Sequence, residues 1–240
     1  MMLESLSGQN VLITGASAGI GLETARQFIQ QGAHVYALGR QREPLNTLKV
    51  EFPEKVTPLI GDVREDVCLR LIEEVSSEID IFVNNAGVLR YAPVLELSPE
   101  DTEWMFEINV VAAFKASQII GRAMAKRGAG HIIFVTSTAA REVFAFASIY
   151  SATKHALSAI ARSMRLELQH LGIRVTEVAP GMVATDIRKE SSHPRVVEAL
   201  AARKFAPLSS NDVAESILFA AMTKASSCPE FIEIRPKGAA

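Results

Sequence analysis

The sequence has few cysteines, no long apolar run and almost no excess charge of either sign. Only Cys68 and Cys228 are cysteines, and no Cys-x-x-Cys or histidine spacing accompanies them, so neither a disulfide framework nor a zinc site is predicted. No run of about 18 residues is both uncharged and apolar, which argues against a membrane-spanning helix. The net charge of −2 gives no electrostatic reason to bind nucleic acid. We therefore expect no metal, membrane or nucleic-acid partner.

The first residues lack the features of a secretory signal. Residues 1–8 contain neither a basic stretch nor an apolar core, so we expect a cytoplasmic protein. Apolar side chains, in contrast, make up 48% of the 240 residues, which is enough to fill a substantial core. Nothing in the composition marks a hinge, and the length therefore predicts one domain over residues 1–240.

Short β-branched apolar runs alternate with longer segments of helical period, as is typical of βα units in a parallel sheet. The expected strands are Asn10–Thr14, His34–Leu38, Val56–Ile60, Ile79–Val83, His131–Thr136, Arg174–Val178 and Phe231–Ile234. Helical segments are expected to begin near Gly19, Glu43, Glu65, Pro99, Ser148, Val196 and Asn211. Residues 186–205 combine a helical pattern with Ser-Ser-His-Pro, so we expect this stretch to be partly loop.

These elements predict an α/β fold with a doubly wound parallel sheet of the Rossmann type, because no internal repeat points to another architecture. In such a sheet, ligands bind beyond the carboxyl ends of the strands. We expect residues 1–130 to form the nucleotide-binding half and residues 131–240 to form the catalytic and substrate half.

The turn after the first expected strand is rich in glycine, reading Thr-Gly-Ala-Ser-Ala-Gly-Ile-Gly over residues 14–21. Glycines let the backbone approach a pyrophosphate at the helix N-terminus. The spacing departs from Gly-x-Gly-x-x-Gly and lacks the lysine of a P-loop, so a turn needed only for chain reversal is the alternative. The expected cofactor contacts are Gly15, Ser17, Gly19, Ile20 and Gly21.

Two further strand ends carry polar or small residues. Asp62 and Val63 follow the third expected strand, where they could hold an adenine edge. Asn84, Ala86 and Gly87 follow the fourth and would reach the same crevice. Asparagine at a strand end is also a common turn former, so each of these signals is weak alone.

The end of the second expected strand bears on the choice of cofactor. An NAD enzyme usually has an acidic residue about 20 positions beyond the glycines, which binds the ribose 2′-hydroxyl. This sequence has Arg40 there instead, and a guanidinium suits a 2′-phosphate. We therefore expect NADP(H) to be preferred, with a solvated basic helix start as the alternative.

Tyr150 and Lys154 lie four residues apart, which places them on one face of a helix. A neighbouring ammonium favours the phenolate and makes tyrosine a usable proton shuttle. Ser137, at the end of the fifth expected strand, could bond a substrate carbonyl oxygen. A Tyr-x-x-x-Lys pair alone is usually structural, so its combination with Ser137 and the glycine loop carries the prediction.

Together these motifs resemble the short-chain dehydrogenase/reductase family over nearly the whole chain. The matching residues are Thr14, Gly15, Gly19, Ile20, Gly21, Asp62, Asn84, Asn85, Ala86, Gly87, Asn109, Ser137, Tyr150, Lys154, Pro180 and Gly181. The resemblance implies that Tyr150 is the general acid/base, that Lys154 lowers its pKa and binds the nicotinamide ribose, and that Ser137 orients the substrate. It also implies that Asn109 holds a water in a proton relay, although by pattern alone Asn109 would be a helix-surface amide.

The resemblance further implies cofactor contacts after the sixth expected strand, at Pro180, Gly181, Val183 and Thr185, close to the nicotinamide carboxamide. It also implies a homotetramer or homodimer, which agrees with the apolar residues on more than one face of the helices around residues 104–125 and 148–171.

The predicted function is therefore an NADP(H)-dependent oxidoreductase that interconverts a carbonyl and an alcohol. Three alternatives stay open: a dehydrogenase working in the oxidative direction on a hydroxy acid or sugar alcohol, a non-catalytic NADP-binding sensor, and an epimerase or dehydratase. Substrate choice is expected to lie in residues 138–149, 89–95 and 182–205. Arg90, Arg141 and Arg188 could meet an anionic substrate, but scattered arginines are more often solvated.

Overall fold

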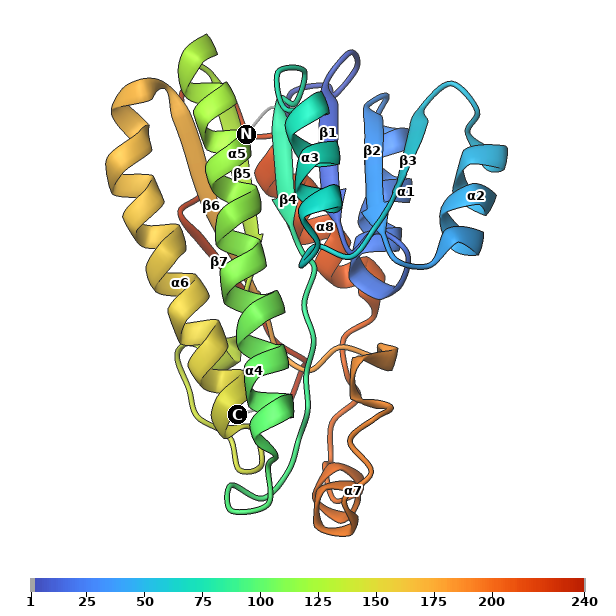
Figure 1. The fold of residues 1–240 in the computed structure, drawn as a ribbon, viewed down its shortest axis with the longest axis vertical. Coiled ribbons are helices and arrows are strands. Elements are labelled where there is room, and N and C mark those ends of the chain that lie inside the picture. Colours follow the sequence, from blue (N-terminus) through green and yellow to red (C-terminus); the bar gives the residue numbers. More distant parts are fainter. Residues whose placement is uncertain (1–2, 240) are drawn as a thin grey trace.

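Seven parallel strands form one sheet in the order β3-β2-β1-β4-β5-β6-β7 (Figure 1). The structure is a computed structural model and describes residues 3–239. The strands are β1 (Asn10–Thr14), β2 (His34–Gly39), β3 (Val56–Ile60), β4 (Ile81–Asn84), β5 (Gly130–Val135), β6 (Ile173–Pro180) and β7 (Phe231–Ile234). This sheet confirms the predicted single α/β domain of the Rossmann type.

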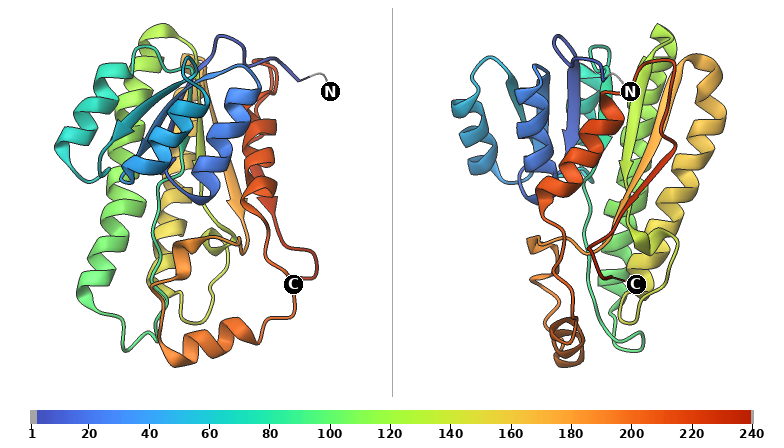
Figure 2. Two further views of the ribbon diagram at one scale, coloured as in Figure 1. Left: turned by 90° about the vertical axis from the view of Figure 1, so that its right-hand side faces the viewer. Right: turned by 180° about the vertical axis from the view of Figure 1, so that it is seen from behind.

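Helices connect the strands and cover both faces of the sheet (Figures 1 and 2). The α-helices are α1 (Gly19–Gln30), α2 (Arg42–Glu51), α3 (Asp66–Val75), α4 (Pro99–Phe106), α5 (Ala113–Arg127), α6 (Ser148–Leu168), α7 (Pro194–Ala201) and α8 (Ser210–Ala221). The short helical turns are η1 (Glu107–Ala112), η2 (Thr138–Ala140), η3 (Gln169–Leu171) and η4 (Asp186–Arg188). Among the described residues, no helix is both long and apolar enough to cross a membrane.

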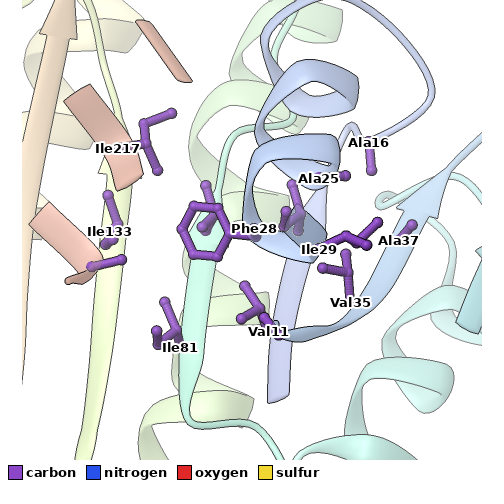
Figure 3. Close-up of a cluster of buried hydrophobic side chains, with 14 of the residues drawn as sticks. Val11, Ala16, Ala25, Phe28, Ile29, Val35, Ala37, Ile81, Ile133 and Ile217 are labelled. Atoms are coloured by element: carbon purple, nitrogen blue, oxygen red, sulfur yellow. The ribbon is translucent and has the colours of Figure 1, made fainter. Parts of the chain in front are cut away.

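One helical layer packs α1 and α8 against the sheet. Phe28 and Ile29 of α1 lie with Val11 of β1 and Ile81 of β4, and Ile217 of α8 joins the same cluster (Figure 3). Full burial of such side chains stabilises the fold by about 1.5–3 kcal/mol each. On the opposite face, α3, α5 and α6 form a second cluster. Both faces of the sheet are therefore covered, which explains why its strands are almost continuously apolar.

Local signals in the sequence account for several helix ends. The Ser98 side chain accepts the backbone N–H of Asp101 at the start of α4, and Ser209 forms a capping box with Asp212 at the start of α8. Helix α5 stops at Gly128, which adopts φ = 70°, a left-handed conformation that favours glycine. Such caps satisfy backbone groups that the helix itself leaves unpaired.

The chain departs from the predicted elements at some strand ends and in one helical segment. The fourth strand begins at Ile81 rather than at Ile79, and the fifth runs from Gly130 to Val135, which is within the usual error at element ends. More notably, α4 and α5 are joined by η1, a π-helical stretch, so that residues 99–127 form one continuous helical segment. Residues 186–205 contain only η4 and α7 between loops, as predicted.

The strand order changes direction between β1 and β4, because β2 and β3 lie on one side of β1 while β4 to β7 follow on the other. At such a switch point the loops leave in opposite directions and open a crevice at the carboxyl ends of the strands. Helix α7 lies beyond that edge, away from the two helical layers (Figures 1 and 2).

Candidate active site

A cavity of about 900 Å³ opens at the carboxyl ends of the strands. Turns that follow β1 to β6 all contribute to its wall, so residues far apart in sequence meet there. The predicted site residues that line it are Gly15, Ser17, Gly19, Ile20, Arg40, Asp62, Val63, Ala86, Gly87, Ser137, Tyr150, Lys154, Pro180, Gly181, Val183 and Thr185. Three predicted residues, Gly21, Asn84 and Asn109, are not part of its lining.

The glycine turn between β1 and α1 forms one end of the cavity. Gly15 has φ = 70°, and a Cβ added there would lie 3.0 Å from the Ala86 Cα atom. A Cβ on Gly21 would lie only 2.2 Å from the Gly15 carbonyl oxygen. Gly21 therefore does not face the cavity. Its missing side chain leaves the space that the Gly15 carbonyl oxygen needs in the tight turn. Ala18, which caps α1, makes no side-chain hydrogen bond to the helix.

This end of the cavity fits a dinucleotide phosphate. The first N–H groups of α1 have no side-chain cap, and Gly19 and Ile20 at this helix start line the cavity. An uncapped helix N-terminus beside a cavity is the usual arrangement for binding an anion. Gly19 keeps the turn open, because a Cβ there would lie 3.2 Å from the Thr185 Cγ2 atom. The loop after β6 thus approaches the glycine turn and closes the cavity around the space left for the phosphates.

Of the two asparagines at the end of β4, Asn85 lines the cavity, whereas the predicted Asn84 does not. Asn84 is buried, and its amide donates to the Ala113 carbonyl at 2.8 Å and to the Ser117 hydroxyl at 2.9 Å, tying β4 to α5. Asn85 instead lines the cavity and donates to the Thr14 carbonyl at 2.9 Å. Side chains of adjacent strand residues point to opposite sides, so only one of the pair can reach the crevice.

Arg40 follows β2, lines the cavity and is exposed. Asp62, after β3, accepts two hydrogen bonds from the Arg64 guanidinium, at 3.1 and 2.9 Å. These bonds lower the pKa of Asp62, and the charge of Arg40 acts in the same direction. Arg64 was not predicted as part of this corner, although it lies only two residues after Asp62 in the chain. At the end of β2, Gly39 leaves room for the Ser17 side chain.

Ser137, Tyr150 and Lys154 come together at the centre of the cavity. Ser137 follows β5, and its hydroxyl accepts the Ala139 backbone N–H at 3.1 Å. Tyr150 and Lys154 lie on the same face of α6, with the Lys154 Nζ atom 5.8 Å from the centre of the tyrosine ring. That Nζ atom donates to the Val135 carbonyl at 3.2 Å, which fixes the ammonium against the end of β5.

Burial dominates the acid–base properties of this group. It raises the pKa of Tyr150 well above its ordinary value, whereas the Ser137 hydroxyl and the charge of Arg188 act in the opposite direction. Burial also lowers the pKa of Lys154 to about 8. Desolvation of the phenolate is thus the largest effect on the pKa of Tyr150. Tyr150 is therefore a phenol at neutral pH and can donate a proton.

Asn109 is fully buried in the π-helical η1 and is not the helix-surface amide that its pattern suggested. Its amide nitrogen donates to the Val88 carbonyl at 2.9 Å and to the Thr153 hydroxyl at 3.1 Å. Its oxygen accepts the Val88 N–H at 2.8 Å. Asn109 thus connects the turn after β4 to α6, directly behind Lys154. The additional residue in a π-turn is what rotates this side chain inward, and no sequence signal marks it.

The far end of the cavity contains residues that the motifs did not identify. The ring of Tyr91 packs edge-on against that of Tyr150, with 6.4 Å between the ring centres. Arg188 and Arg203 also line this end and are half-buried. For Arg188 this corrects the expectation of a solvated side chain. The other two arginines considered earlier lie outside the lining: Arg90 pairs with Asp101 and Glu190, and Arg141 stacks 3.5 Å over the Phe231 ring.

Comparison with known proteins places this geometry in context. The profile of the family described as short chain dehydrogenase matches residues 9–195. The farnesol dehydrogenase of Aedes aegypti is 32% identical over 98% of this chain and 99% of its own. The NADP-dependent 3-hydroxy acid dehydrogenase of Salmonella typhi is 36% identical over 72% of each chain.

A similar fold is found among solved structures. The closed form of serine dehydrogenase, complexed with NADP⁺, superimposes with a TM-score of 0.84 over 94% of each chain, at 31% identity. The likeness therefore extends over nearly the whole fold.

Proposed function

This chain belongs to the short-chain dehydrogenase/reductase family, whose members are oxidoreductases acting on alcohols and carbonyls with a nicotinamide cofactor, and on that premise we propose that it is an NADP(H)-dependent enzyme that interconverts a carbonyl and an alcohol. The names of the relatives mention farnesol and a 3-hydroxy acid, so they do not agree on one substrate.

The observation that carries this proposal is the convergence of two independent motifs on one cavity. The glycine turn lies at one end, and Ser137, Tyr150 and Lys154 lie at its centre. A protein that only bound the nucleotide would not need a buried tyrosine beside a buried lysine, since burying polar groups costs free energy. These two residues therefore favour an enzyme over the non-catalytic NADP-binding sensor.

Each side chain has a role that follows from its position. When bound, NADP(H) would supply or accept the hydride at the carbon of the substrate. Tyr150, a phenol at neutral pH, donates a proton to the carbonyl oxygen during reduction and takes it back during oxidation. The Ser137 hydroxyl holds that oxygen beside Tyr150. The Lys154 ammonium stabilises negative charge as Tyr150 gives up its proton.

Arg40 supports a preference for NADP(H) over NAD(H). It follows β2 at the edge of the cavity, and no carboxylate of the described chain forms an ion pair with it. Its guanidinium is therefore available for a 2′-phosphate, which it can bind through two parallel hydrogen bonds.

Three broader features are part of the same proposal. Residues 1–130 supply most of the cofactor contacts, and residues 131–240 supply the chemistry and most of the substrate contacts. The protein works in the cytoplasm, and it assembles as a homodimer or homotetramer through α5 and α6.

The proposal is tested by following the absorbance of NADPH, and in parallel NADH, against aldehydes, ketones, diketones, oxo acids, 3-oxoacyl thioesters and steroids. We expect turnover that prefers NADPH. In the Tyr150→Phe variant we expect turnover to fall by about 10²–10⁴-fold, because the proton donor is lost, while NADPH still binds.

The matched control is Tyr36→Phe, which removes another tyrosine hydroxyl, one that donates to Glu78 outside the cavity. This control should keep its activity. Near-normal turnover by Tyr150→Phe would refute the assigned chemistry, and equal or better turnover with NADH would refute the cofactor preference.

A further inference from the structure

Two arginines stand at the substrate end of the cavity without a carboxylate partner. Arg188 belongs to η4 and Arg203 follows α7, and both line the cavity together with Tyr91 and Tyr150. The Arg188 guanidinium donates to the Val183 carbonyl. The Arg203 Nη1 atom lies 2.7 Å from the Met182 sulfur, which is a weak acceptor. Both contacts orient the guanidinium groups but neutralise no charge.

The acidic residues nearby are already paired. Glu190 binds Arg90 at 2.9 Å, and Asp186 binds Lys189 at 2.8 Å. Within residues 3–239, no carboxylate oxygen lies within 4.0 Å of Arg188 or Arg203. This end of the cavity therefore carries two positive charges that the protein does not balance.

Such charges are costly when they are partly removed from water. Burial lowers the pKa of Arg188, which means that its charged form is less well solvated than in water. The charges of Arg188 and Arg203 also oppose the rise that burial causes in the pKa of Tyr91, and that of Arg188 acts on Tyr150. The charge of Arg188 thus acts on the reacting hydroxyl of Tyr150, and that of Arg203 acts on the neighbouring Tyr91. An anion placed between the two arginines would relieve their desolvation.

We propose that the substrate is a small carboxylic acid bearing a hydroxyl or carbonyl group, whose carboxylate is bound by Arg188 and Arg203 while its reacting oxygen lies between Ser137 and Tyr150. This inference rests on the proposed function and names its substrate class. In the oxidative direction, Tyr150 first releases its proton to solvent, and the Lys154 ammonium stabilises the resulting phenolate. The alcohol carbon then gives its hydride to NADP⁺ while the substrate hydroxyl gives its proton to the phenolate, which yields the oxo acid, NADPH and one proton released to solvent.

The shape of the site favours a carboxylate on a short carbon chain. A guanidinium presents parallel N–H groups that match the two oxygens of a carboxylate. The cavity of about 900 Å³ must contain the cofactor as well as the substrate, which leaves room for a small molecule only.

The experiment compares 3-hydroxybutyrate with its uncharged methyl ester as substrates, using NADP⁺ and the wild-type protein. We expect a higher kcat/KM for the acid. In Arg188→Met and in Arg203→Met, the ratio of kcat/KM for the acid to that for the ester should fall by at least about tenfold, the range expected for a hydrogen bond to a charged group. Replacing either arginine by lysine should restore part of the ratio. Lysine keeps the positive charge but lacks the parallel N–H groups of the guanidinium.

The matched control is Lys204→Met, which removes a positive charge from the neighbouring exposed residue outside the cavity. It should leave the ratio unchanged. An equal fall in the control, an unchanged ratio in both arginine variants, or a change confined to the KM for NADP⁺ would overturn the proposal. Faster turnover of glycerol 3-phosphate than of the acid would overturn it too, because the site would then serve a phosphate.

A binding measurement keeps this inference separate from the proposed function. Trp104 is the only tryptophan and lines the cavity, so its fluorescence can report binding without turnover. If neither compound is oxidised but 3-hydroxybutyrate binds more tightly than its ester, and binds less tightly in the arginine variants, the carboxylate site stands and the proposed oxidoreductase activity on this compound fails. If the acid and the ester bind equally, the carboxylate site fails.

Discussion

At the scale of single residues, the chemistry depends on a buried carboxylate that the motifs do not include. Glu177, in β6, is 1% exposed and accepts hydrogen bonds from the Thr136 hydroxyl at 2.8 Å and the Ser158 hydroxyl at 2.9 Å. Its charge raises the pKa of Lys154 and so opposes the effect of burial. Glu177 is thus a positioning residue, which helps Lys154 to stay protonated near neutral pH.

This arrangement predicts a shift in pH dependence. In Glu177→Gln the pKa of Lys154 should fall below about 8, because the only favourable charge acting on it is removed. Lys154 then loses its proton at lower pH, and the alkaline limb of the profile of kcat/KM for carbonyl reduction should move down by about one pH unit. Glu177→Asp keeps the charge and is the control. If the alkaline limb of the pH profile does not move in Glu177→Gln, Glu177 has a packing role alone.

The sequence could predict a residue's role where that role depends on local backbone geometry. It could not predict the role where the orientation of the side chain depends on packing between distant segments. The positive φ of Gly15 and the shared helix face of Tyr150 and Lys154 follow from local geometry. Which of Asn84 and Asn85 reaches the cavity does not, since it depends on where β4 stops relative to α5.

At the scale of elements, contacts with the loop after β4 hold residues 186–205 over the substrate end. The Arg90 guanidinium pairs with Glu190 at 2.9 Å, and the Tyr91 N–H donates to the Ser191 hydroxyl at 3.0 Å. His193 also lies 3.0 Å from a Glu96 carboxylate oxygen. The Arg90–Glu190 and His193–Glu96 pairs are partly exposed, so each should contribute modestly and weaken with salt. The hydrogen bond between Tyr91 and Ser191 is partly buried.

Removing one of them should loosen this segment without unfolding the sheet. Glu190→Gln breaks the pair with Arg90, and an exposed pair of this kind contributes about 0.2–1 kcal/mol. We therefore expect limited proteolysis within residues 186–205 to become up to about fivefold faster at low salt, with a smaller difference at high salt. The control is Arg26→Met, which breaks the pair with Glu51 on the opposite side of the nucleotide half. It should not change the cleavage rate within residues 186–205. Equal cleavage rates in Glu190→Gln and the wild type would contradict the role of the Arg90–Glu190 pair.

Strands and most helices could be predicted because their periodicity is local. The π-helical η1 could not, because its additional residue is accommodated only by packing of the continuous segment 99–127 against α6 and the turn after β4. The same stretch decides whether Asn109 faces solvent or the interior.

At the scale of the whole molecule, the outer surface of α5 and α6 remains apolar in places. Phe114 is 38% exposed and Leu166 is 71% exposed, although neither side chain lies in the two clusters that hold the sheet. We expect these helices to meet a second copy of the chain.

Sedimentation at micromolar concentration should therefore show a dimer or tetramer. Phe114→Lys places a charge in the expected contact and should shift the mass toward the monomer, since an unpaired charge is costly to bury. Val50→Lys changes an exposed valine on α2 and should leave the mass unchanged. A monomer for the wild type would refute the expected assembly.

The sequence by itself determined the order of the βα units, the glycine turn, and the helix that carries Tyr150 and Lys154, because each depends on side chains close together along the chain. Only the tertiary structure decided which groups face the cavity. It placed Arg188 and Arg203 beside Tyr91, put Glu177 behind Lys154, and buried Tyr150 deeply enough that desolvation outweighs its charged neighbours. The reason is that burial and electrostatic potential sum over segments far apart in sequence, and those distances exist only once the sheet and its loops have packed.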